Sequence, residues 1–101
     1  MGVDLEFFGH KADNNIIRSP LGVINNCHLG GGAKWLRDLV WEHVQIDFCV
    51  PGGDVQPTLI AKIADKLRLA ALYKPQEERL LLAALIFQVA KERCWRAEVS
   101  F

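Results

Sequence analysis

The sequence lacks a net charge of either sign. Its 101 residues include twelve Lys and Arg and twelve Asp and Glu, so the formal charge at pH 7 is zero. Residues 1–50 hold four basic and six acidic side chains, and residues 51–101 hold eight and six. Neither half has the excess of positive charge with which proteins attract nucleic acid or anionic lipid. We therefore expect neither nucleic acid nor a membrane as the partner.

Long apolar runs are also missing. The longest, Leu80 to Phe87, has eight residues, whereas a helix that spans a bilayer needs about twenty. The first residues contain no basic segment followed by an apolar one, as a secretory signal would, and Glu6 stands where an N-myristoylation motif requires Ser or Thr. These absences predict a soluble, cytoplasmic protein.

Cysteine is scarce. Cys27, Cys49 and Cys94 are odd in number and far apart, unlike the dense, even pattern of a disulfide-stabilised secreted domain. No Cys-x-x-Cys or His-x-x-x-His pair accompanies them, so no metal site is predicted. A thiolate activated by one of the three histidines is an alternative that no motif supports. We predict reduced thiols, no metal and no cofactor.

Three consecutive glycines, Gly30 to Gly32, stand immediately before a predicted helix. A phosphate-binding P-loop ends in Gly-Lys followed by Ser or Thr, but here Lys34 follows Ala33, and Trp35 occupies the position of the hydroxyl. The dinucleotide-binding fingerprint fails as well, because its spaced third glycine is absent. The segment is predicted to be a flexible joint, at which glycine permits a sharp turn.

An alternative interpretation assigns a ligand to this segment. A helix start exposes unpaired backbone N–H groups and the positive end of the helix dipole, which together favour an anion. An anionic small molecule would then contact Gly31, Gly32, Lys34 and Arg37. In this interpretation the protein is a small enzyme or binding protein, and a histidine assists any chemistry.

Three segments have the alternation of apolar and polar residues that is typical of strands. Residues 3–8 and 95–101 alternate at the two ends of the chain, with Gly9 ending the first, and residues 44–50 alternate in the middle. Because short strands are unstable alone, we expect the terminal strands to pair with each other or with the middle one.

Apolar residues spaced by three and four predict helices elsewhere. One helix spans residues 33–43, while Pro57 and Pro75 open two more, which form a tight hairpin over residues 56–93. The last of these helices is apolar nearly all round, which indicates an element covered on several sides. A short helix or turn is expected at residues 21–26.

These elements predict a single α+β domain over residues 1–101. Its small, mostly antiparallel sheet would contain both terminal strands and residues 44–50. The sheet would pack on the helical hairpin, with the helix of residues 33–43 alongside. A chain of this length has room for one such core.

We interpret the chain first as a protein-interaction module, because no arrangement of catalytic residue types is visible. An inhibitor or adaptor, such as a phage-type accessory protein, would act by binding another macromolecule. Phe8 and Trp41 fall outside the predicted apolar faces, and exposed aromatic side chains are enriched at binding hot spots. The polar segment from His10 to Ser19 is expected at the surface, where recognition often occurs. The predicted contacts are Phe8, His10, Lys11, Asn14, Asn15, Arg18 and Trp41.

Self-association is a further expectation. An open edge of the sheet offers unpaired backbone groups to a second copy. The apolar last helix, residues 75–93, offers a second route. Either would produce a homo-oligomer.

Overall fold

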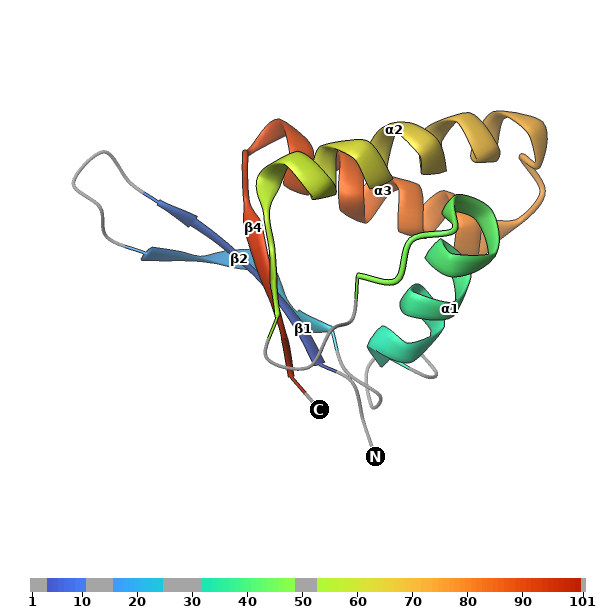
Figure 1. Ribbon diagram of the computed structural model, residues 1–101. Coiled ribbons are helices and arrows are strands. Elements are labelled where there is room, and N and C mark those ends of the chain that lie inside the picture. Colours follow the sequence, from blue (N-terminus) through green and yellow to red (C-terminus); the bar gives the residue numbers. More distant parts are fainter. Residues whose placement is uncertain (1–3, 11–15, 25–31, 49–52, 101) are drawn as a thin grey trace.

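The computed structural model describes residues 4–10, 16–24, 32–48 and 53–100 and shows an α+β fold (Figure 1). A small antiparallel sheet lies on one side, and three helices pack against one of its faces. The predicted fold class is therefore confirmed. The elements are β1 (Asp4–His10), β2 (Ile16–Ile24), α1 (Gly32–Val44), β3 (Asp54–Val55), α2 (Pro57–Tyr73), α3 (Glu78–Glu92) and β4 (Arg96–Ser100).

The two terminal strands pair with each other, as predicted. The strand order is β2-β1-β4-β3, and every neighbouring pair is antiparallel. Leu5 lies opposite Val99 and Phe7 opposite Ala97, and all four of these side chains are buried. The strand does not end at Gly9, since β1 continues to His10. The inward face of this central pair is one wall of the core.

Strand β2 corrects the prediction of a short helix or turn at residues 21–26 over residues 21–24, since 25 and 26 lie outside the described residues, and it includes the end of the polar segment from His10 to Ser19. The strand covers residues 16–24 at one edge of the sheet. Its pairing with β1 is irregular, because residues 19–22 of β2 lie opposite Phe7 alone. Pro20 falls inside this irregularity, where an edge strand tolerates a residue without an N–H group.

The predicted strand at residues 44–50 is wrong over the residues that the structure describes. Helix α1 continues to Val44, and Gln45, with a φ of 63°, donates its backbone N–H to the carbonyl oxygen of Trp41. This left-handed residue turns the chain out of the helix, and residues 46–48 then form no strand. Phe48 is nevertheless buried. The alternation of apolar and polar residues here reflects the burial of side chains such as Phe48. Residues 45–48 form no hydrogen bonds of a strand.

The helical hairpin is confirmed. Helix α2 has Pro57 in its first turn and buries a stripe of residues at helical spacing, namely Ile60, Ile63, Ala64, Leu67 and Ala71. Helix α3 begins at Glu78, three residues later than Pro75, which instead lies in the turn between the helices. No helix within the described ranges is long and apolar enough to cross a membrane.

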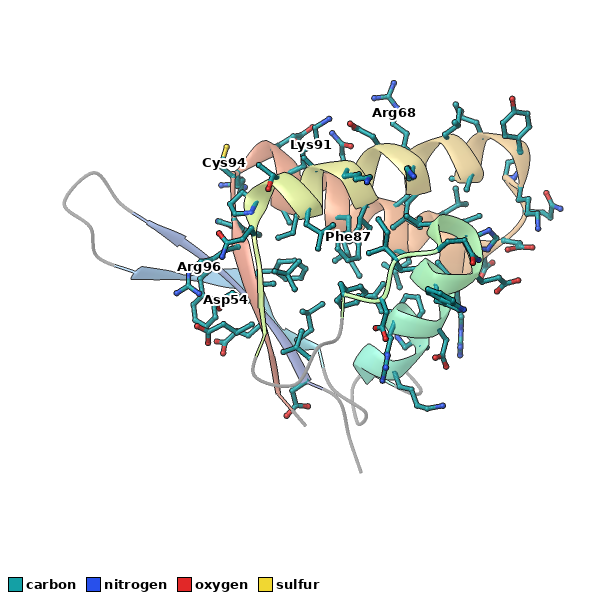
Figure 2. The ribbon with its side chains drawn as sticks, in the orientation of Figure 1. Asp54, Arg68, Phe87, Lys91, Cys94 and Arg96 are labelled. Atoms are coloured by element: carbon teal, nitrogen blue, oxygen red, sulfur yellow. The ribbon has the colours of Figure 1, made fainter. Side chains whose placement is uncertain are left out.

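Phe87 is at the centre of the core, between the hairpin and the sheet (Figure 2). Its ring makes edge contacts with Phe7 of β1, at 6.1 Å between ring centroids, and with Phe48, at 5.6 Å. Trp95 packs beside Phe7 at 6.4 Å. This aromatic cluster joins the sheet, α3 and the segment after α1 into one core.

Candidate interaction surface

The outer side of the helical hairpin carries four exposed leucines. Leu69 and Leu72 lie on α2 and are 56% and 71% exposed, and Leu81 and Leu85 lie on α3 and are 42% and 61% exposed. We call these four residues the hairpin face. Tyr73, which is 80% exposed, and Leu82, which is 39% exposed, lie at its margins. A single exposed leucine is ordinary, whereas clusters of exposed apolar side chains are commonly found at binding surfaces.

Helix geometry places these leucines on one side of the molecule. Residues three or four apart share a helix face, as do Leu69 with Leu72 and Leu81 with Leu85. Both helices bury their opposite stripes in the same core. An ion pair between Asp65 of α2 and Lys91 of α3 crosses the hairpin. The exposed leucines of both helices therefore point away from this shared core, on the same side of the hairpin.

Charged residues lie beside the hairpin face on both helices, and the exposed ones that remain apart from the Asp65–Lys91 ion pair and the Arg79–Trp35 contact differ in sign between the helices. Lys62, Lys66 and Arg68 are exposed on α2, and Figure 2 shows Arg68 pointing away from the body of the molecule. Glu78 and Glu92 are exposed at the two ends of α3. None of these five side chains forms a salt bridge with another described residue.

Two open hollows adjoin the hairpin face on α2. One, of about 300 Å³, is lined by Asp65, Arg68, Leu69 and Leu72. The other, of about 360 Å³, lies between the end of α1 and α2 and is lined by His43, Val44, Lys66, Leu69, Ala70 and Tyr73. Leu69 borders both hollows. The surface beside Leu69 is therefore uneven, with two open recesses.

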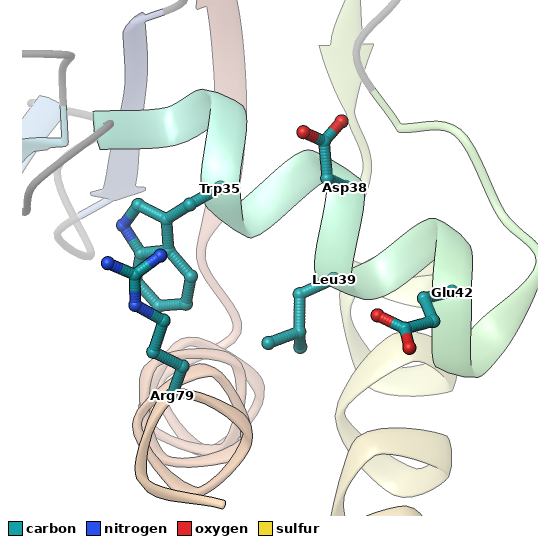
Figure 3. A pocket seen from close by; sticks show the side chains of 5 residues that line it. All are labelled: Trp35, Asp38, Leu39, Glu42 and Arg79. Atoms are coloured by element: carbon teal, nitrogen blue, oxygen red, sulfur yellow. The ribbon is translucent and has the colours of Figure 1, made fainter.

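A third recess lies between α1 and the start of α3 (Figure 3). Its volume is about 270 Å³, and its lining residues are Trp35, Asp38, Leu39, Glu42 and Arg79. The Arg79 guanidinium lies 5.7 Å from the centroid of the Trp35 ring, which is a cation–π contact. Trp35 is 8% exposed, and no described residue accepts a hydrogen bond from its Nε1. The cation in this recess is therefore already engaged by the protein.

Phe8, a predicted partner contact, is buried, which contradicts the exposure that we expected of it. It is 6% exposed, because Arg96 of the adjacent strand lies over its ring at 5.1 Å. Arg96 also donates hydrogen bonds to Asp54, at 3.1 Å, and to Glu98, at 2.9 Å. Arg96 thus forms ion pairs with Asp54 of β3 and with Glu98 of its own strand, while Glu6 of β1 lies opposite Glu98 in the register.

Trp41, the other predicted aromatic contact, is exposed as expected. It lies on α1 with 52% of its surface accessible, and its role in binding stays a prediction. His10 and Arg18 belong to β1 and β2, but their side chains are not among those described. Lys11, Asn14 and Asn15 lie outside the described residues.

The structure gives acidic partners to both cations of the predicted anion site. Lys34 lies 3.5 Å from Asp38, and Arg37 donates two hydrogen bonds to Asp47, at 3.1 and 2.9 Å. Gly32 begins α1, while Gly31 lies outside the described residues. A ligand would have to compete with these carboxylates.

The thiols provide no assembled site in the described part of the chain. Cys94 is exposed, whereas the neighbouring Trp95 is buried. Cys94 has a φ of 54° and lies two residues after the end of α3, in the turn that leads to β4. Cys27, His28 and Cys49 lie outside the described residues. Within the described part of the chain, no three His, Cys, Asp or Glu side chains lie close enough together to hold a metal ion.

Comparisons with protein-family models, curated proteins and solved structures find no match for this chain. The sequence did contain a signal for the hairpin face that our reasoning misread. Residues 80–87 are apolar nearly all round the helix, and we expected cover on several sides. In the structure α3 buries one stripe, which includes Leu80 and Phe87, and leaves Leu81 and Leu85 exposed.

Proposed function

We propose that the protein is a small interaction module, an inhibitor or adaptor, that binds another macromolecule through the hairpin face. The observation that supports this function is the exposure of Leu69, Leu72, Leu81 and Leu85 on neighbouring helices. With their margins they expose several hundred Å² of apolar surface, comparable to the largest patch on a typical monomer, about 300–600 Å². Such patches are commonly functional.

The energetics favour covering this surface. Burial of apolar area contributes about 25 cal/mol per Å², so a partner that covers the hairpin face gains on the order of 10 kcal/mol before the costs of association. Tyr73 and Arg68 at the margins are residue types enriched at binding hot spots. The surrounding lysines and glutamates form the polar rim that interfaces usually have. The fold would thus act by occupying a surface of its partner.

A pull-down tests the hairpin face against α1. The double variant Leu72→Glu/Leu85→Glu places two charges in the face, and we expect it to lose at least about tenfold of the partner retained by the wild type, because each hot-spot residue contributes about 2 kcal/mol or more. Trp41→Ala removes the exposed aromatic of α1 and should retain the partner. Circular dichroism checks that both variants fold.

The opposite pattern would contradict the proposal. If Trp41→Ala abolishes retention while the double leucine variant keeps its partner, the binding surface lies on α1. Equal retention by all three proteins would also exclude the hairpin face.

A further inference from the structure

We infer that the partner on the hairpin face is a second copy of this chain, arranged as a symmetric dimer in which α3 of each copy packs against α2 of the other. This inference rests on the proposed function and names the occupant of the same surface. It follows from the segregation of charge around the face and from the level at which each residue lies along the hairpin.

The α2 side of the face is basic. Lys62, Lys66 and Arg68 are exposed there, and the single acidic residue among them, Asp65, is paired with Lys91. A partner that packs against α2 therefore meets uncompensated positive charge. Opposite charges at the rim of an interface guide association and select its orientation.

The α3 side of the face is acidic. Glu78 and Glu92 flank the exposed leucines of this helix. The arginines nearby are directed to aromatic rings away from the face, Arg79 to Trp35 at 5.7 Å and Arg93 to Trp95 at 5.8 Å. The hairpin face is thus basic along one helix and acidic along the other.

The Asp65–Lys91 ion pair sets the levels of the two antiparallel helices. Glu92 follows Lys91 and therefore lies level with the part of α2 that includes Lys62 and Lys66. Leu85 lies six residues before Lys91, and the position six residues after Asp65 is next to Leu72. Because the helices are antiparallel and have the same rise per residue, Leu85 is level with the end of α2, near Leu72. Leucine is thus level with leucine, and glutamate with lysine.

A two-fold axis that lies in the interface, parallel to the helices, brings both the leucines and the opposite charges into contact. It places α3 over α2 of the second copy, so Leu85 meets Leu72 and Glu92 approaches Lys62 and Lys66. An axis perpendicular to the helices would instead place α2 over α2 and bring the basic residues together. Because a two-fold interface uses the same patch on both copies, each favourable contact occurs twice.

The size of the molecule is compatible with such an interface. A standard interface covers about 800 Å² on each partner, which is roughly an eighth of the 6089 Å² surface of this chain. The hairpin face supplies an apolar centre of several hundred Å², and the charged residues supply the rim. This division between centre and rim is typical of interfaces between proteins.

Charge reversal tests the dimer. In one variant, Lys62→Glu/Lys66→Glu makes α2 acidic, and in the other, Glu92→Lys reverses the charge of α3 at the level of these two lysines. We expect the wild type to sediment as a dimer and each variant alone to associate at least about tenfold more weakly, because like charges then meet. An equimolar mixture of the two variants should form a heterodimer, since every contact again joins opposite charges. Glu42→Lys, an exposed residue of α1, is the matched control and should remain dimeric.

The alternatives give distinct results. A monomeric wild type, or variants whose mixture does not associate better than either alone, overturns the dimer. Another result is a wild type that is a monomer and captures a different protein, which Leu72→Glu/Leu85→Glu does not retain. In that case only the inferred second copy fails, and the proposed function stands. If the wild type is monomeric and no partner depends on these leucines, both fail.

Discussion

Replacing Phe87 with Ala is expected to lower the free energy of unfolding by about 3–5 kcal/mol. Phe87 is 1% exposed and contacts the rings of Phe7 and Phe48. The substitution removes the apolar transfer free energy of the ring and leaves a cavity that joins the sheet, α3 and the segment after α1. Urea unfolding followed by circular dichroism measures the loss.

The control for this variant is Glu42→Ala, an exposed residue of α1. A surface substitution of this kind should change the free energy of unfolding by no more than about 0.5 kcal/mol. A Phe87→Ala protein within 1 kcal/mol of the wild type, on the order of a simple surface change, would contradict the position of Phe87 at the centre of the core.

Adding one methyl group at Gly9 should also destabilise the protein, by about 1–3 kcal/mol for overpacking. A Cβ atom at this position would lie 2.7 Å from both Cδ1 and Nε1 of Trp95. Trp95 is 5% exposed and packs against Phe7, so a shift of its ring would disturb the core. Chemical unfolding of Gly9→Ala measures this effect.

A double-mutant cycle isolates the cause at Gly9. In a Trp95→Leu background the indole is absent, so Gly9→Ala should cost much less than it does in the wild type. The same cost in both backgrounds would show that the effect does not come from contact with Trp95.

Local patterns predicted the helices and the terminal strands because each pattern acts through residues close in sequence. The stripe of α2 from Ile60 to Ala71 follows helical spacing, and its predicted start at Pro57 is observed. The alternation in β1 and β4 places Leu5, Phe7, Ala97 and Val99 in the core. Their pairing followed from the need of two short strands to bury one face.

The errors arose where tertiary contacts decide the structure. Phe48 is buried by packing on Phe87, and this burial produces a strand-like alternation without strand pairing. In β2 the β-branched residues at both ends favour a strand, but Pro20 interrupts the pattern, and only the irregular register with β1 accommodates it. Neither the absence of a strand at Phe48 nor the irregular pairing of β2 can be predicted from the local periodicity of apolar residues.

The candidate site was predicted less well than the fold. Trp41 is exposed as expected, whereas Phe8 is covered by Arg96 from a strand almost ninety positions later in the chain. The hairpin face was missed because leucines at helical spacing are usually assigned to the core. An apolar pattern in the sequence shows which residues can be buried. Whether they are buried within this chain depends on how many other elements pack around the helix.

The fold explains why the hairpin carries an apolar surface on each side. The sheet covers one side of α2 and α3, and α1 packs against the same two helices. Among the described residues, no element packs over Leu72 and Leu85, which stay 71% and 61% exposed. The inner leucines therefore stabilise the fold, and the outer ones are available for association.

The most direct test of the hairpin face is photo-crosslinking from position 85 in living cells. Benzoylphenylalanine in place of Leu85 should give a light-dependent product heavier than the 11.4 kDa chain, and twice that mass if the partner is a second copy. The same group in place of Glu42 on α1 should give none. Absence of a product from position 85, or equal products from both positions, would contradict a partner on the hairpin face.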